Sequence, residues 1–125
     1  MAHVSVRYIV HDVDEAVSFY TERLGFEVDM HPGPGFARVS RGPLRLLLNA
    51  ASGPGGAAQP TPDGTNPEPG GWNRIQLEVD DLGHEVDALR AVGATFRNDI
   101  VTGRGGQQIL LEDPSGNPIE LFQSV

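Results

Sequence analysis

A single carboxylate stands in a short apolar run near the end of the chain. The sequence DPSGNPIELF, residues 113–122, opens as a turn, and Glu120 lies in the strand-like part that follows. An acid in this setting has four interpretations: a metal ligand, a general base, half of an ion pair, or a residue on the solvent-exposed face of a sheet. The residues that the fold brings to Glu120 must decide between them.

The histidines and cysteines offer little metal chemistry. His3, His11, His31 and His84 include no pair at the His-x-x-x-His spacing of a helical metal site. We interpret His11, His31 and His84 as surface or structural residues, and only His3 shares the strand face expected for Ser5. Cysteine is absent, which excludes disulfides, a thiolate metal site and a cysteine nucleophile.

The charge balance narrows the classes of partner. The 125-residue chain has a net charge of −8, and its nine cationic residues are all Arg. This disfavours nucleic acid, which needs a concentrated basic surface, and favours a cationic ligand, although the charge could serve solubility alone. No apolar run approaches the roughly 18 residues that span a bilayer, and the N-terminus lacks the features of a signal peptide. We expect a cytoplasmic protein.

Two segments of the sequence resemble each other, residues 4–28 and 73–96. Aligning Asp12 with Asp81 matches a strand pattern followed at once by a helix pattern in each copy. The strands alternate apolar and polar residues, which is typical of a half-buried strand. Asp12 and Asp81 stand where N-caps would lie, with Glu15 completing a capping box, and Gly25 and Gly93 follow as stops.

Each helix pattern is followed by three strand-like runs. They cover residues 26–31, 35–41 and 43–49 in the first half, and 95–102, 106–112 and 118–123 in the second. The sequence therefore predicts an α+β fold made of two βαβββ modules, residues 1–49 and 72–125, within one domain spanning 1–125. Half of residues 50–71 are Gly or Pro, so we expect this segment to be either a flexible linker or a lid over a binding cleft.

Several of these features together resemble a known superfamily. The paired modules, the segment HDVDEAVSFYTERLGFEV (residues 11–28) and the turn DPSGNPIELF are similar to the vicinal oxygen chelate superfamily. Its members include glyoxalase I, bleomycin-resistance proteins, fosfomycin-resistance enzymes and extradiol dioxygenases. The resemblance implies that each module forms half of an open barrel, that two halves enclose a ligand cleft, and that the chain forms a homodimer.

The resemblance also implies where a divalent metal would bind. Metal-dependent members place ligands at four strand positions, which map here onto Ser5, Arg74, Glu120 and, least securely, Asn49, with Leu47 on the same face. Arg is always protonated and has no lone pair to donate, and Ser and Asn are weak ligands. Only Glu120 suits a metal, so we expect no metal or other cofactor.

Arg74 and Glu120 are expected to face each other as a charge-assisted pair. The pair could be purely structural, Arg74 could bind a carboxylate or carbonyl of a ligand, or Glu120 could act as a general base. The residues that we expect to line the ligand site are the following: Ser5, Arg7, Asn49, Trp72, Arg74, Gln76, Glu120 and Phe122. Trp72 could stack on a flat ligand or fill a core or dimer interface, and Phe122 could form an apolar floor.

The functional expectation is therefore a metal-independent protein of the bleomycin-resistance type. It would bind a cationic or aromatic small molecule, such as an antibiotic, and would need no catalytic residue. The alternative is a glyoxalase-like lyase or isomerase, or a dioxygenase, that uses Glu120 with a divalent metal. A third possibility is a structural or regulatory dimer with a vestigial cleft.

Overall fold

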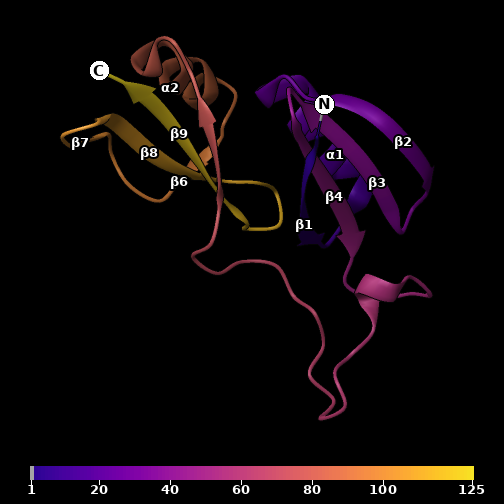
Figure 1. Ribbon diagram of the computed structural model, residues 1–125. Coiled ribbons are helices and arrows are strands. Elements are labelled where there is room, and N and C mark those ends of the chain that lie inside the picture. Colours follow the sequence, from indigo (N-terminus) through magenta and orange to yellow (C-terminus); the bar gives the residue numbers. More distant parts are fainter. Residues whose placement is uncertain (1) are drawn as a thin grey trace. The chain divides into compact units, whose positions relative to one another are not determined.

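The computed structural model describes residues 2–125, which fold into two compact units that the chain links between Gly70 and Gly71. Each unit contains one α-helix and one mixed sheet (Figure 1). The predicted α+β class is confirmed.

The first unit has the predicted order βαβββ. Its elements are β1 (Val4–Val10), α1 (Val13–Leu24), β2 (Glu27–Gly33), β3 (Phe36–Arg41) and β4 (Leu44–Ala50). The sheet order is β1-β4-β3-β2, in which β1 runs parallel to β4 and the other pairs are antiparallel. Helix α1 packs on β2, β3 and β4. It buries Val13, Ala16 and Tyr20, which lie on one face of the helix.

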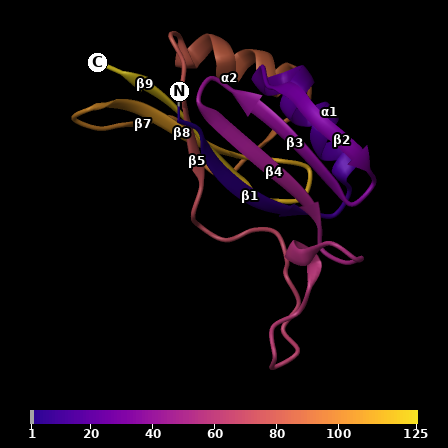
Figure 2. The same cartoon turned by 45° about the vertical axis from the view of Figure 1, so that its right-hand side comes forward.

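The second unit repeats this connectivity. Its elements are β5 (Ile75–Glu78), α2 (Leu82–Ala91), β6 (Thr95–Phe96), β7 (Val101–Thr102), β8 (Gly106–Glu112) and β9 (Pro118–Ser124). The sheet order is β5-β9-β8-β6, with β7 also paired to β8, and β5 runs parallel to β9. Figure 2 shows the neighbouring strands β8 and β9 of this sheet. Because β5 and β9 take the places of β1 and β4, the internal repeat read from the sequence is confirmed.

The helix ends follow their local sequences. The Asp12 carboxylate accepts a hydrogen bond from the backbone N–H of Glu15, and Asp81 accepts one from His84 in the same way. Gly25 ends α1 in the left-handed region at φ 73°, where a residue without Cβ is favoured. Both predicted N-caps are confirmed.

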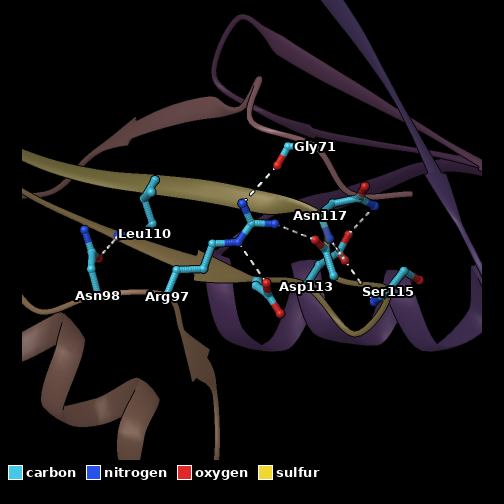
Figure 3. Close-up of polar contacts among 9 residues, drawn as sticks. Gly71, Arg97, Asn98, Leu110, Asp113, Ser115 and Asn117 are labelled. Atoms are coloured by element: carbon cyan, nitrogen blue, oxygen red, sulfur yellow. Dashed lines mark hydrogen bonds and ion pairs between the residues drawn. The ribbon is translucent and has the colours of Figure 1, made fainter. Parts of the chain in front are cut away.

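The run 95–102, predicted as one strand, is two short strands instead. After Phe96 the Arg97 N–H still donates to the carbonyl of Leu110, but the Leu110 N–H donates to the Asn98 side-chain Oδ1 at 2.9 Å (Figure 3). A side chain here occupies the position of a backbone acceptor, so regular pairing stops until Val101. The bend was not visible in the alternation of side chains.

The Gly/Pro-rich segment after β4 is partly structured. It contains a 3-10 turn, η1 (Gly56–Ala58), which contacts β4 and buries Ala58. Residues 59–66 are all exposed. The segment therefore consists of a part that packs on the first unit and a part that does not.

Within residues 2–125 the structure contains no helix that could span a membrane. Neither α1 nor α2 is long and apolar enough to cross a bilayer.

Candidate functional site

Glu120 is held in a hydrogen-bonded cluster on the β5–β9 ladder. Gln76 in β5 lies directly opposite Glu120 in β9, and its Nε2 donates to Glu120 Oε2 at 2.6 Å. Arg74, which precedes β5, donates to the other carboxylate oxygen, Oε1, from Nε at 3.1 Å and from Nη2 at 2.9 Å. The predicted Arg74–Glu120 pair is confirmed.

The burial of this cluster determines its electrostatics. The Glu120 side chain is 8% exposed and that of Arg74 is 29% exposed. A buried carboxylate needs a counter-charge and hydrogen-bond donors, and here it receives one cation and three N–H groups. Because both oxygens are engaged and the nearest charge is a fixed cation, Glu120 is poorly placed to accept a proton from a substrate.

A second polar contact lies in the first unit. Arg7 in β1 donates from Nη1 to Oδ1 of Asn49 in β4 at 2.6 Å, and Asn49 is 5% exposed. Ser5 lies two residues before Arg7, on the same face of β1, and is exposed. The structure therefore forms two hydrogen-bonded groups, Arg7 with Asn49 and Glu120 with Arg74 and Gln76. Within residues 2–125, the side chains of Ser5 and Phe122 form no hydrogen bond with these groups.

The sheet register corrects the mapping of the least secure metal position. Arg7 pairs with Leu47 in the first sheet, and Gln76, which aligns with Arg7 in the repeat, pairs with Glu120 in the second. The counterpart of Glu120 is therefore Leu47 and not Asn49. The alternation of side chains predicted which face of β4 these residues occupy but not which residue of β1 each one pairs with. The sequence therefore could not distinguish Leu47 from Asn49.

These residues do not fit a divalent metal. With the register corrected, the four positions hold Ser5, Leu47, Arg74 and Glu120, of which Leu47 has no donor atom and Arg74 brings a positive charge. Within the part of the chain that the structure describes, no group of three or more His, Asp or Glu residues is arranged to hold a metal ion. Metal chemistry at Glu120 therefore finds no support in the donor set.

The first unit also contains a cavity of about 370 Å³ beside Asn49. It lies between the β2–β3 turn, the end of β4 and the segment that holds η1. Its side walls include Pro32, Pro34, Phe36 and Pro54. Such a volume lies within the range of small-molecule sites, roughly 300–1,000 Å³. The sequence analysis did not predict this cavity, because residues 50–58 show no helix or strand periodicity.

Trp72 and Arg97 form a separate contact in the second unit. Trp72 is 74% exposed, and the guanidinium carbon of Arg97 lies 5.5 Å from the centroid of the Trp72 ring. Arg97 also donates to Glu112 Oε2 at 2.8 Å, to the Gly71 carbonyl at 2.9 Å and to the Gly116 carbonyl at 3.1 Å (Figure 3). Arg97, which the sequence analysis passed over, thus ties the start of the second unit to the turn before β9.

The turn before Glu120 is stabilised by its first residue. Asp113 is 4% exposed, and its Oδ1 accepts from the backbone N–H groups of Ser115 and Asn117, both at 2.9 Å. Its Oδ2 accepts from Asn117 Nδ2 at 3.0 Å (Figure 3). This turn sets the start of β9 and hence the position of Glu120 two residues into the strand.

Comparison with known proteins identifies the family. Residues 1–121 match the family model described as the Glyoxalase/Bleomycin resistance protein/Dioxygenase superfamily. The chain belongs to this superfamily. A search of curated proteins finds no match to this superfamily member.

Solved structures of the superfamily resemble the chain along its whole length. A member of the superfamily from Sphaerobacter thermophilus DSM 20745 is 27% identical, with a TM-score of 0.77 and coverage of 99% of this chain and 97% of that one. TnmS3, an antibiotic binding protein from Streptomyces sp. CB03234, is 25% identical, with a TM-score of 0.74 and coverage of 100% and 98%. Lactoylglutathione lyase from Agrobacterium tumefaciens is 18% identical, with a TM-score of 0.74 and coverage of 98% and 92%, which shows the fold alone.

Proposed function

We propose that this superfamily member binds a small organic molecule without a metal ion and without catalysing a reaction. The proposal rests on one observation: both carboxylate oxygens of Glu120 already accept hydrogen bonds from Arg74 and Gln76. The cation supplies the counter-charge that a metal would otherwise give to the carboxylate. Binding alone requires no general base and no open coordination position.

Two further observations support this proposal. The first unit holds a cavity of suitable size beside a buried polar side chain, Asn49. One structural neighbour, TnmS3, is described as an antibiotic binding protein. The lyase neighbour supports no reaction here, since its likeness extends only to the fold.

The setting of the protein is part of the proposal. We expect the protein to form a homodimer in the cytoplasm and to bind neither membranes nor nucleic acids. The exposed apolar side chains of Val28 and Met30 on the edge strand β2 support self-association. Light scattering coupled to size-exclusion chromatography measures the oligomeric state directly.

The absence of a metal requirement is tested by metal analysis and by thermal unfolding. The purified protein should contain no stoichiometric metal, and Ni²⁺, Zn²⁺, Mn²⁺ or Fe²⁺ should leave its unfolding midpoint unchanged. Arg74→His should gain metal-dependent stabilisation, because it removes the cation and places an imidazole near Glu120. Arg104→His is the matched control, since Arg104 is an exposed turn residue. Stoichiometric metal in the unaltered protein would overturn the proposal.

A further inference from the structure

The cavity beside Asn49 has a distinctive chemical composition. Three prolines and Phe36 provide flat apolar surfaces, and the remaining lining comes from small residues of the β2–β3 turn and of the η1 segment. Among residues 2–125, no Asp, Glu, Arg, Lys or His lines the cavity. A charged guest would lose hydration here without gaining a counter-charge, so the cavity suits an uncharged molecule. Proline and phenylalanine faces suit an aromatic ring.

Asn49 adds one directional polar group to these apolar walls. Asn49 is 5% exposed and is one of the residues that line the cavity, and its Oδ1 accepts a hydrogen bond from Arg7. Because a guanidinium only donates, Asn49 must turn Oδ1 toward Arg7, which leaves its Nδ2 group for a different acceptor. An N–H donor at the edge of an apolar cavity gains a net hydrogen bond only from a guest that carries an acceptor. The positive charge of Arg7 behind the amide also disfavours a cationic guest.

The wall opposite the β2–β3 turn is held in place by Gln59. Its Nε2 donates to the carbonyls of Gly53 at 3.0 Å and Gly55 at 3.1 Å, and these residues flank Pro54. The Ala50 N–H donates to the carbonyl of Gly35 at 3.0 Å, which joins the end of β4 to the β2–β3 turn. Hydrogen bonds within the chain therefore hold both walls, and walls held in this way lose less entropy when a ligand binds.

From these contacts we infer that the cavity binds an uncharged, planar aromatic molecule with a carbonyl group that accepts a hydrogen bond from Asn49 Nδ2. The inference rests on the proposed function and specifies the class of its ligand. Phe36 and the prolines contact the ring, Asn49 selects the acceptor, and Arg7 and Gln59 are positioning residues.

Three two-ring probes test this ligand class. We would titrate the complete chain with 1,4-naphthoquinone, naphthalene and N-methylquinolinium in the presence of EDTA, and follow amide signals by NMR. The absence of cysteine and lysine side chains makes a quinone usable. Naphthoquinone should bind about fivefold more tightly than naphthalene, the ratio expected for one net hydrogen bond. N-methylquinolinium should bind most weakly, and the shifted signals should come from Gly33, Gly35, Gly55 and the Asn49 side chain.

Asn49→Asp is the most specific variant for this inference. Aspartate keeps the shape and the acceptor for Arg7 but has no N–H to donate, so the preference for naphthoquinone over naphthalene should disappear. Phe36→Ala should weaken both neutral probes, while Gln107→Ala, in the second unit, should leave all affinities unchanged. Gln59→Ala should weaken both neutral probes equally and keep their ratio, as expected for a residue that positions the wall.

The outcomes separate this inference from the proposed function. Naphthoquinone that binds without metal but shifts only signals of the second unit would overturn the inference and leave the proposed function standing. Binding that appears only after a divalent metal is added would overturn both. Equal affinity for all three probes, or no binding of any probe, would also contradict the inferred ligand class.

Discussion

Arg74 compensates for the cost of a buried carboxylate at Glu120. The Glu120 side chain is 8% exposed, so removing its cation leaves a charge with poor access to water. We expect Arg74→Ala to lower the free energy of unfolding by about 2 kcal/mol, less than for a fully buried pair because Arg74 is partly exposed. The double variant Arg74→Met, Glu120→Leu should lose less than Arg74→Ala alone, since it removes both charges. Urea unfolding measures both values.

Arg104→Ala serves as the matched control for this experiment, because Arg104 is exposed in the turn before β8. It should change the free energy of unfolding by less than about 0.5 kcal/mol. A loss of similar size in Arg74→Ala and Arg104→Ala would mean that Arg74 does not stabilise Glu120.

Asp63 gives a residue-level prediction on pH. The Thr61 hydroxyl and then the Thr65 backbone N–H donate to this carboxylate and lower its pKa from 3.8 to about 2. Because the folded pKa lies below the unfolded value, the carboxylate stabilises its turn fully above pH 3.8, and this contribution is lost as the pH falls through about 2.

The pKa of Asp63 is measured by following its side-chain carboxyl carbon by NMR during an acid titration. Thr61→Val removes the main donor and should raise the midpoint toward 3.8, whereas Thr21→Val, on α1, should leave it unchanged. A midpoint near 3.8 in the unaltered protein would show that the turn does not hold its hydrogen bonds in solution.

At the residue scale the sequence predicted which side chains share a face of the sheet. It did not predict which of them lie opposite each other along the strands. Alternation placed Arg74, Gln76 and Glu120 on one side of neighbouring strands, and the side chains of Arg74 and Glu120 do meet. The same reasoning could not choose between Leu47 and Asn49, since both have the same parity. It also passed over Arg97, because a residue with three backbone and side-chain acceptors in an irregular loop leaves no periodic trace.

At the element scale the turn at residues 113–117 explains why its sequence is a good indicator of the fold. Asp113 satisfies two backbone N–H groups and one side-chain amide in a buried position, which few other residues could do. We expect Asp113→Ala to lower the free energy of unfolding by about 2–3 kcal/mol, because buried donors lose their acceptor.

The ligand site should respond differently to the same change. At temperatures where Asp113→Ala remains folded, naphthoquinone affinity should equal that of the unaltered protein, because the cavity belongs to the first unit. Asp87→Ala, at an exposed position of α2, is the control for stability. Thermal unfolding and NMR titration of both variants would contradict this view if Asp113→Ala lost ligand binding while folded.

The elements that the sequence predicted well are those with local causes. Asp12 and Asp81 cap their helices through contacts three residues away, which is a distance that sequence patterns reveal. The strand 95–102 was predicted wrongly because its interruption depends on Asn98 reaching Leu110, a partner twelve residues further along the chain. Contacts of that kind follow from the folded sheet and not from periodicity.

At the scale of the whole chain, the repeat accounts for how much could be predicted. Two copies of one pattern reinforce each other, and the matching sheet orders β1-β4-β3-β2 and β5-β9-β8-β6 follow from it. The segment between the copies has no counterpart in the repeat. The sequence left it open as a linker or a lid, and its composition alone could not show that η1 packs on β4.

The structure predicts two different behaviours within this segment. Ser52, Pro54, Gly55 and Ala58 line the cavity, whereas residues 59–66 are exposed throughout. Inserting a Gly/Ser stretch between Asn66 and Pro67 that doubles the exposed part should cost about 0.6 kcal/mol of stability, because loop closure depends only weakly on length. It should leave naphthoquinone affinity unchanged. The same insertion between Gly55 and Gly56 should weaken binding, since it separates the carbonyls of Gly53 and Gly55 from η1 and from Gln59, whose side chain donates to them. Equal loss of binding in both variants would instead assign the whole segment to a lid, and NMR titration of the two proteins distinguishes these results.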